Sequence, residues 1–297
     1  MSGTGTPSVA MSGAESSRAS LGRVPSTWAQ AVILSRYQLR DYLRSRRFVL
    51  MMSIVALVGV ILTAVVAYFR PASLIDNSSD FYGGLWAGGA SFVILFAGII
   101  FGGDAIAGEF QNKTGYFLMG LPVQRTTVYT GKYLAALAAS LVTLVVFLLI
   151  VVGNAAFYLG PGAFTNLAPL LASFVLALLY LLALLGFTFL FSSLFKTSLY
   201  AVLVVAVLFL FGFTIISSVA TSLAHIEPWF LISYASSIIG YPLTGTPPHI
   251  AHIRSPFGGG TMTVYSPSIP EGIAIMAGYF LITSLLGLWL FEREEFT

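Results

Sequence analysis

The chain has 297 residues, of which 57% are hydrophobic and only 8% are charged. A soluble domain carries about 25% charged residues, so the composition excludes an ordinary soluble enzyme. The formal net charge is +3, and the sequence contains no cysteine, which excludes disulfide frameworks, thiol nucleophiles and cysteine-based metal sites. The composition predicts an all-α integral membrane protein.

The N-terminal segment divides into two parts. Residues 1–26 are rich in Ser, Gly, Ala and Thr and have no periodic apolar pattern, so we expect a disordered cytoplasmic tail. Residues 27–47 place an apolar stripe beside a basic row at helical spacing. The stripe consists of Trp28, Val32, Leu39 and Leu43, and the row consists of Arg36, Arg40, Arg44 and Arg47.

An amphipathic helix of this kind is typical of the membrane interface, where basic side chains face anionic lipid headgroups. The segment directly precedes the first long apolar run, which favours membrane lipid over nucleic acid as the partner of its arginines. The alternative is a cytoplasmic helix packed on loops of the same protein.

Six uncharged apolar runs follow, each near the ~20 residues that a helix needs to cross the hydrocarbon. They cover about 48–69, 84–103, 133–153, 169–195, 199–223 and 272–291. We therefore interpret residues 27–297 as one transmembrane domain with six spans.

The basic residues indicate how the spans are oriented. Twelve of the 14 Lys and Arg residues fall in the N-terminal segment, the second and fourth connections and the C-terminus. The positive-inside rule then predicts a multi-pass protein of the cell membrane with both termini in the cytoplasm. No ionisable residue lies in the middle of a span, which disfavours a carrier coupled to protons or sodium. A secondary carrier or a channel not powered by ATP stays open as the alternative function.

The second connection, 104–132, is the most distinctive stretch between spans. It is too long for a hairpin turn and carries two carboxylates on a basic background. Pro122 ends any helix that precedes it, and Thr126 or Thr127 is a candidate N-cap for a helix that enters the third span. A short helix, a turn and a re-entry into the membrane would suit docking into a groove on a soluble partner.

Several residues of this connection follow a known order. Gly-Glu, Thr, Leu-Pro-Val, Arg and Gly-Lys occur at 108–109, 114, 121–123, 125 and 131–132. With the six spans, the amphipathic helix and the C-terminal Phe-Glu-Arg at 291–293, this pattern resembles the type-2 ATP-binding-cassette (ABC-2) transporter permeases. The resemblance implies the membrane-spanning subunit of an ATP-driven exporter, which forms the translocation pathway as a homodimer or with a second permease.

In that family the second connection forms a coupling helix that docks on a separate cytoplasmic ATPase subunit. The resemblance implies that the contact includes Gly108, Glu109, Thr114, Leu121, Pro122 and Arg125. The sequence contains no G-x-x-x-x-G-K-[ST] phosphate loop, so we expect no enzyme activity and no cofactor on this chain. ATP and Mg²⁺ would then be bound by the partner subunit.

The fifth connection, 224–271, lies on the outer side in this arrangement. Its first part, 227–239, is apolar but too short to span, which predicts a re-entrant or interfacial helix, whereas 240–271 is dense in Pro and Gly and predicts a loop. Structural zinc normally takes four protein ligands, so we expect exposed loop histidines here rather than a metal site. These histidines are His225, His249 and His252, beside Glu227.

Overall fold

The computed structural model describes residues 26–69, 77–112, 123–165, 167–254 and 261–293. The predicted tail up to residue 25 lies outside these ranges, as do Thr114, Leu121 and Pro122 of the predicted partner contact. Six segments of the described part are long and apolar enough to cross a membrane. They are Arg46–Phe69, Ser78–Gln111, Arg125–Phe164, Leu167–Leu194, Ser198–Ser222 and Ile269–Arg293. The all-α membrane class with six spans is confirmed.

Three of the spans are single helices, and three contain other helical turns. The single helices are α3 (Arg46–Phe69), α10 (Leu167–Leu194) and α15 (Ile269–Arg293). The third span joins α9 (Arg125–Leu159) to a 3₁₀ turn at Gly160–Phe164. The second span consists of α5 (Ser78–Tyr82), α6 (Gly88–Ala97) and α7 (Ala107–Gln111), with π-helical turns at Gly83–Ala87 and Gly98–Gly102. The fifth span consists of α11 (Ser198–Val207) and α12 (Phe213–Ser222), joined by a π-helical turn at Leu208–Gly212.

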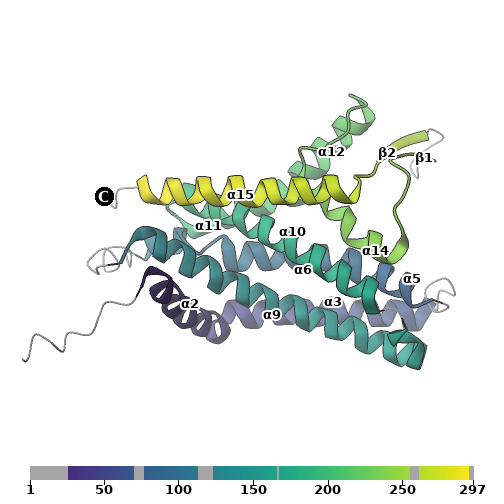
Figure 1. Cartoon of the computed structure of the whole chain (residues 1–297), viewed down its shortest axis with the longest axis horizontal. Coiled ribbons are helices and arrows are strands. Elements are labelled where there is room, and N and C mark those ends of the chain that lie inside the picture. The colour runs from purple at the N-terminus through teal and green to yellow at the C-terminus, as the bar shows by residue number, and fades with distance from the viewer. Residues whose placement is uncertain (1–25, 70–76, 113–122, 166, 255–260, 294–297) are drawn as a thin grey trace, which may run out of the picture.

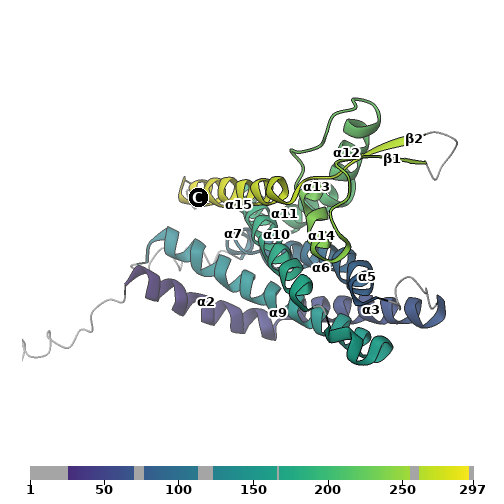
Figure 2. The ribbon, with the colours of Figure 1, turned by 45° about the vertical axis from the view of Figure 1, so that its right-hand side comes forward.

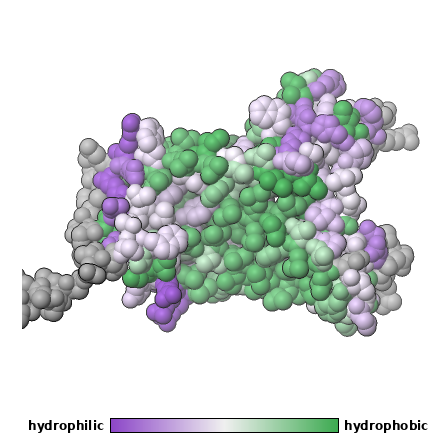
Figure 3. All heavy atoms as spheres, viewed as in Figure 1, coloured by the Kyte–Doolittle hydropathy of each residue, from purple (hydrophilic) through white to green (hydrophobic). Residues whose placement is uncertain are grey.

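The spans form an elongated bundle with two different ends (Figure 1). Helix α2 (Thr27–Arg44) and the C-terminal end of α15 lie at one end, and α5, α14 and the two strands lie at the other. Helix α12 diverges from the other spans in both ribbon views (Figures 1 and 2). On the face shown in Figure 3, a broad apolar band covers the middle and the hydrophilic residues gather at the two ends. This distribution is the one expected of a membrane-spanning bundle.

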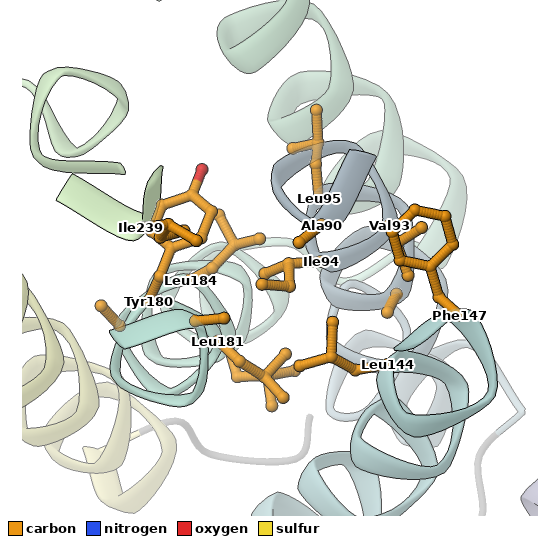
Figure 4. Packing of buried hydrophobic residues seen from close by; sticks show 14 of the residues in the cluster. Ala90, Val93, Ile94, Leu95, Leu144, Phe147, Tyr180, Leu181, Leu184 and Ile239 are labelled. Atoms are coloured by element: carbon orange, nitrogen blue, oxygen red, sulfur yellow. The ribbon is translucent and has the colours of Figure 1, made fainter. Parts of the chain in front are cut away.

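The core of the bundle lies between α6, α9 and α10. Side chains of Ile94, Leu144 and Leu184, one from each helix, point toward one another there (Figure 4) and are fully buried. In this core the Trp86 indole donates to Ser173 Oγ over 2.9 Å, and Ser173 itself donates to a backbone carbonyl. Pairing of this kind avoids the cost of an unsatisfied polar group in an apolar interior.

Small residues allow the second span to approach α10 closely. Gly98 and Gly102 form a G-x-x-x-G pair, which in membrane helices permits close backbone contact. A Cβ atom at Gly102 would lie 2.1 Å from Thr188 Oγ1, and one at Gly98 would lie 3.0 Å from Leu184 Cδ2. The end of the second span that leads into loop 104–132 is therefore seated directly on α10.

Helix α2 packs along α9 with a face that overlaps the predicted apolar stripe only in part, since Leu39 of the stripe packs against the core. Its buried residues are Ala31 and Tyr42, whereas Trp28 at the start of the stripe is 66% exposed. Gly131 of α9 makes room for this contact, since a Cβ there would lie 2.9 Å from Leu34 Cδ2. The packed face is rotated from the stripe because α9 meets the side of α2 opposite its arginines.

The region between α12 and α15 is more ordered than the sequence predicted. It contains α13 (Ile232–Ala235), a 3₁₀ turn at Ser236–Gly240 and α14 (Tyr241–Thr244), which pack into the end of the bundle. Strands β1 (Ile250–Arg254) and β2 (Thr261–Tyr265) then form an antiparallel hairpin. The expectation of a loop throughout 240–271 was wrong, because the β-branched and aromatic residues of β2 (TMTVY) favour a strand despite the surrounding Pro and Gly.

Candidate functional site at the root of loop 104–132

The two ends of loop 104–132 lie side by side at one end of the bundle. The first end is a turn at 103–106 followed by α7, and the second is the start of α9. Ser192 of α10 fixes the turn, because its hydroxyl accepts the backbone N–H groups of Ile106 and Ala107 over 2.9 and 3.0 Å. Ser192 is fully buried and supplies from a neighbouring helix the acceptor that an N-cap side chain would otherwise provide.

An ion pair joins the two ends of the loop. Lys132 of α9 donates to Glu109 Oε1 over 2.5 Å and to the Ala105 carbonyl over 3.0 Å. The Lys132 side chain is 5% exposed and that of Glu109 is 19% exposed, so both charges are largely removed from solvent. The Gly-Glu and Gly-Lys parts of the motif thus meet in space, although 23 residues separate the paired side chains.

A second ion pair attaches the turn to the start of α3. The Arg47 guanidinium bonds to an Asp104 carboxylate oxygen. Beside it, the Tyr42 hydroxyl of α2 donates to the Phe101 carbonyl over 3.3 Å. Burial raises the pKa of Tyr42, and the Asp104 carboxylate adds to this effect. The phenol therefore stays protonated and remains a donor. Arg47, predicted to face lipid, is thus placed against a carboxylate.

The start of α9 is also tied to the C-terminal end of α15. Arg125 donates to the Glu292 carbonyl over 2.7 Å, and the Thr126 hydroxyl donates to Glu292 Oε1 over 2.9 Å. Helix α9 begins at Arg125 with Gln124 at its N-cap position, without a side-chain capping bond. The predicted capping role of Thr126 or Thr127 was wrong, because Thr126 bonds to α15 and Thr127 is buried.

The predicted site residues have different surroundings. Gly108 is buried, and a Cβ there would lie 3.1 Å from the Asp104 carboxylate. Glu109 and Arg125 bond within the chain as described above, while the remaining three predicted contact residues lie outside the described ranges. The first three arginines of the basic row are exposed on the face of α2 away from α9: Arg36, Arg40 and Arg44.

Sequence reasoning missed the residues that hold the loop in place. Ser192 lies beside Ser193 near the end of an apolar span, where a serine usually bonds to its own helix, and nothing nearby in the sequence marks its contact with the turn. The pairing of Lys132 with Glu109 had a signal, since both stand at motif positions of opposite charge at the two ends of one connection. The contact between Arg125 and Glu292 spans most of the chain and has no local signal.

The three histidines of the fifth connection lie near the other end of the bundle and do not form one cluster. His225 has a positive φ of 52°, and its carbonyl accepts the Tyr265 hydroxyl. His252 pairs with Thr263 across the hairpin. Only His249 lies beside Glu227, with 3.4 Å between Nε2 and Oε2.

These observations define the class: a six-span helical membrane protein with a motif-bearing loop rooted at one end. A family model described as ABC-2 family transporter protein matches residues 32–296. Comparison with curated proteins gave no match. The chain belongs to the ABC-2 transporter family. It is a transmembrane permease component of an ABC transporter rather than a catalytic enzyme, and family members generally work with an ATP-binding subunit.

Proposed function

We propose that the chain is the permease subunit of an ATP-driven exporter and that loop 104–132 couples it to a separate ATPase subunit. In this proposal the partner binds ATP and Mg²⁺, and closure of the ATPase pair pushes on the loop. The end of the bundle with α2 and the loop faces the cytoplasm. A second permease copy completes the translocation pathway.

The observation that carries the proposal is the way the loop is rooted. Its two ends bond to each other through Lys132 and Glu109, to α10 through Ser192, and to α15 through Arg125. Gln111 at the end of α7 accepts the backbone N–H of Ser198, where the fifth span begins. A push on the loop would therefore reach the ends of five spans through packed helices and short bonds, which is the contiguous path that mechanical coupling needs.

The outward face of α2 supports a role for lipid at the same end. Arg36 and Arg40 are exposed there together with Ile33 and Tyr37, which are 47% and 64% exposed. Basic and apolar side chains on one surface suit the boundary between anionic headgroups and acyl chains. We propose that this face rests on the cytoplasmic leaflet and positions the first span.

The test is affinity purification of a tagged chain from its native membrane, followed by mass spectrometry. The variant is Leu121→Asp, because Glu109 already pairs inside the chain and its replacement would damage the root of the loop. The matched control is Leu223→Asp, at a leucine that is 75% exposed in the turn after α12. We expect the wild type and the control to retain a soluble protein with a phosphate-loop motif, and Leu121→Asp to lose it.

Failure to recover such a protein with the wild type, under detergent conditions that keep the chain folded, would contradict the proposal. Transport by the purified chain in liposomes without ATP would favour the secondary carrier or channel instead. Equal recovery with Leu121→Asp would leave the permease class standing and would remove the loop from the contact.

A further inference from the structure

Three ligand-type side chains converge near the end of the bundle opposite loop 104–132. Glu227 follows α12, His249 precedes β1, and Glu271 lies in the first turn of α15. One donor atom from each of the three lies within 4.8 Å of the other two, and the closest pair, His249 Nε2 and Glu227 Oε2, is 3.4 Å apart. The three side chains therefore come from segments that are far apart in the sequence and meet at one point in the structure.

The side chains of this group are oriented by groups outside it. His249 Nδ1 lies 2.9 Å from the Ser266 carbonyl, which can only accept, so Nδ1 is the donor of this bond and Nε2 is the ring nitrogen that faces the Glu227 carboxylate. The Tyr234 hydroxyl donates to Glu227 Oε1, which leaves Oε2 available. The Ser268 N–H donates to Glu271 Oε2 over 3.2 Å. Metal-binding histidines and carboxylates are typically held by outer bonds of this type.

The two carboxylates of Glu227 and Glu271 favour the binding of a cation between them. Two carboxylates at this separation repel each other unless a positive charge lies between them. One imidazole nitrogen and two carboxylate oxygens are ligands that zinc accepts, and tetrahedral zinc places its ligand atoms about 3.3–3.5 Å apart. The 3.4 Å between His249 and Glu227 agrees with that spacing. A protonated His249 is the competing source of positive charge.

We propose that Glu227, His249 and Glu271 bind a divalent first-row metal ion, with zinc as the best match. Water would fill the open coordination position, since the His249 side chain is 54% exposed. The ion would fasten the hairpin and the connection after α12 to the start of α15. His252 takes no part, because residues three apart around the start of a strand point to opposite faces.

The test measures zinc binding by the purified full-length chain in detergent, in competition with a chromophoric chelator. We expect one zinc per chain for the wild type. His249→Gln and Glu271→Gln should each weaken the affinity by at least the 10- to 100-fold typical for loss of an outer-shell partner. His252→Gln, at a second histidine of the same hairpin, is the matched control and should bind like the wild type. Cobalt should replace zinc and give a visible absorption band that His249→Gln abolishes.

Thermal unfolding separates loss of the site from loss of the fold. Without metal, His249→Gln should unfold at the same temperature as the wild type, and zinc should raise the midpoint of the wild type and of His252→Gln only. The proposal is overturned if the wild type binds no stoichiometric zinc, or if His249→Gln binds as tightly as the wild type. A wild type that ignores zinc but loses stability with His249→Gln would assign the positive charge to the imidazole instead.

Discussion

Single residues at the root of loop 104–132 explain why the motif has the composition it has. Glu109 and Lys132 stand at motif positions, and their charges neutralise each other where water is largely excluded. Removing one member of such a pair leaves an uncompensated charge, which costs more than the pair itself contributes. The motif therefore serves the internal structure of the loop as well as any contact with a partner.

Lys132→Met should destabilise the chain by about 3 kcal/mol, because Glu109 then loses its counter-charge in a largely buried position. The double variant Lys132→Met with Glu109→Gln should recover part of this loss, since the Glu109 charge is then removed as well. Thermal unfolding of the purified variants in detergent measures the loss in the single variant and the recovery in the double variant. A double variant less stable than Lys132→Met would show that the two side chains do not act as a pair.

Ser192→Ala should cost about 1–3 kcal/mol for each of the two buried N–H groups that lose their acceptor. Ser193→Ala is the matched control, because Ser193 is equally buried but bonds only to the Phe189 carbonyl of its own helix. We expect less than about 1 kcal/mol for the control. Unfolding midpoints of the two variants should therefore differ clearly, and equal midpoints would refute the role given to Ser192.

At the scale of elements, the close contact between the second span and α10 depends on Gly98 and Gly102, which have no side chain. Gly102→Ala should destabilise the chain by about 1–3 kcal/mol through overpacking against Thr188. Thr188→Ala should restore part of that loss in the double variant. Gly88→Ala is the control, because a Cβ at Gly88 has nothing within 4 Å. Comparable losses for Gly102→Ala and Gly88→Ala would contradict the packing described for these helices.

Elements differ in how far the sequence could predict them. The six spans were predictable because length and hydropathy are local properties, and each observed segment covers most of its predicted range. The packed face of α2 was not, because Ala31 packs on α9 and Tyr42 packs on Phe101 of the second span, and both partners lie far along the chain. The sequence predicted Glu109 and Arg125 as contact residues. It could not predict that Arg125 bonds to Glu292, because this bond depends on how the ends of two distant helices meet.

At the scale of the whole molecule, the proposed orientation can be tested directly because the chain contains no cysteine. Gln124 and Thr246 are exposed at opposite ends of the bundle, before α9 and after α14. A single cysteine at Thr246 should react with a membrane-impermeant maleimide added to intact cells. A single cysteine at Gln124 should react only after the membrane is opened. The reverse pattern would place loop 104–132 outside the cell.

The most direct measurement of the central claim is photo-crosslinking from the root of the loop in living cells. A photoreactive amino acid at Gln124, which is exposed next to α9, is compared with the same residue at Thr246. We expect an adduct between the Gln124 variant and a protein with a phosphate-loop motif, and no such adduct from Thr246. Absence of the adduct from Gln124, or its appearance from Thr246 alone, would contradict coupling through loop 104–132.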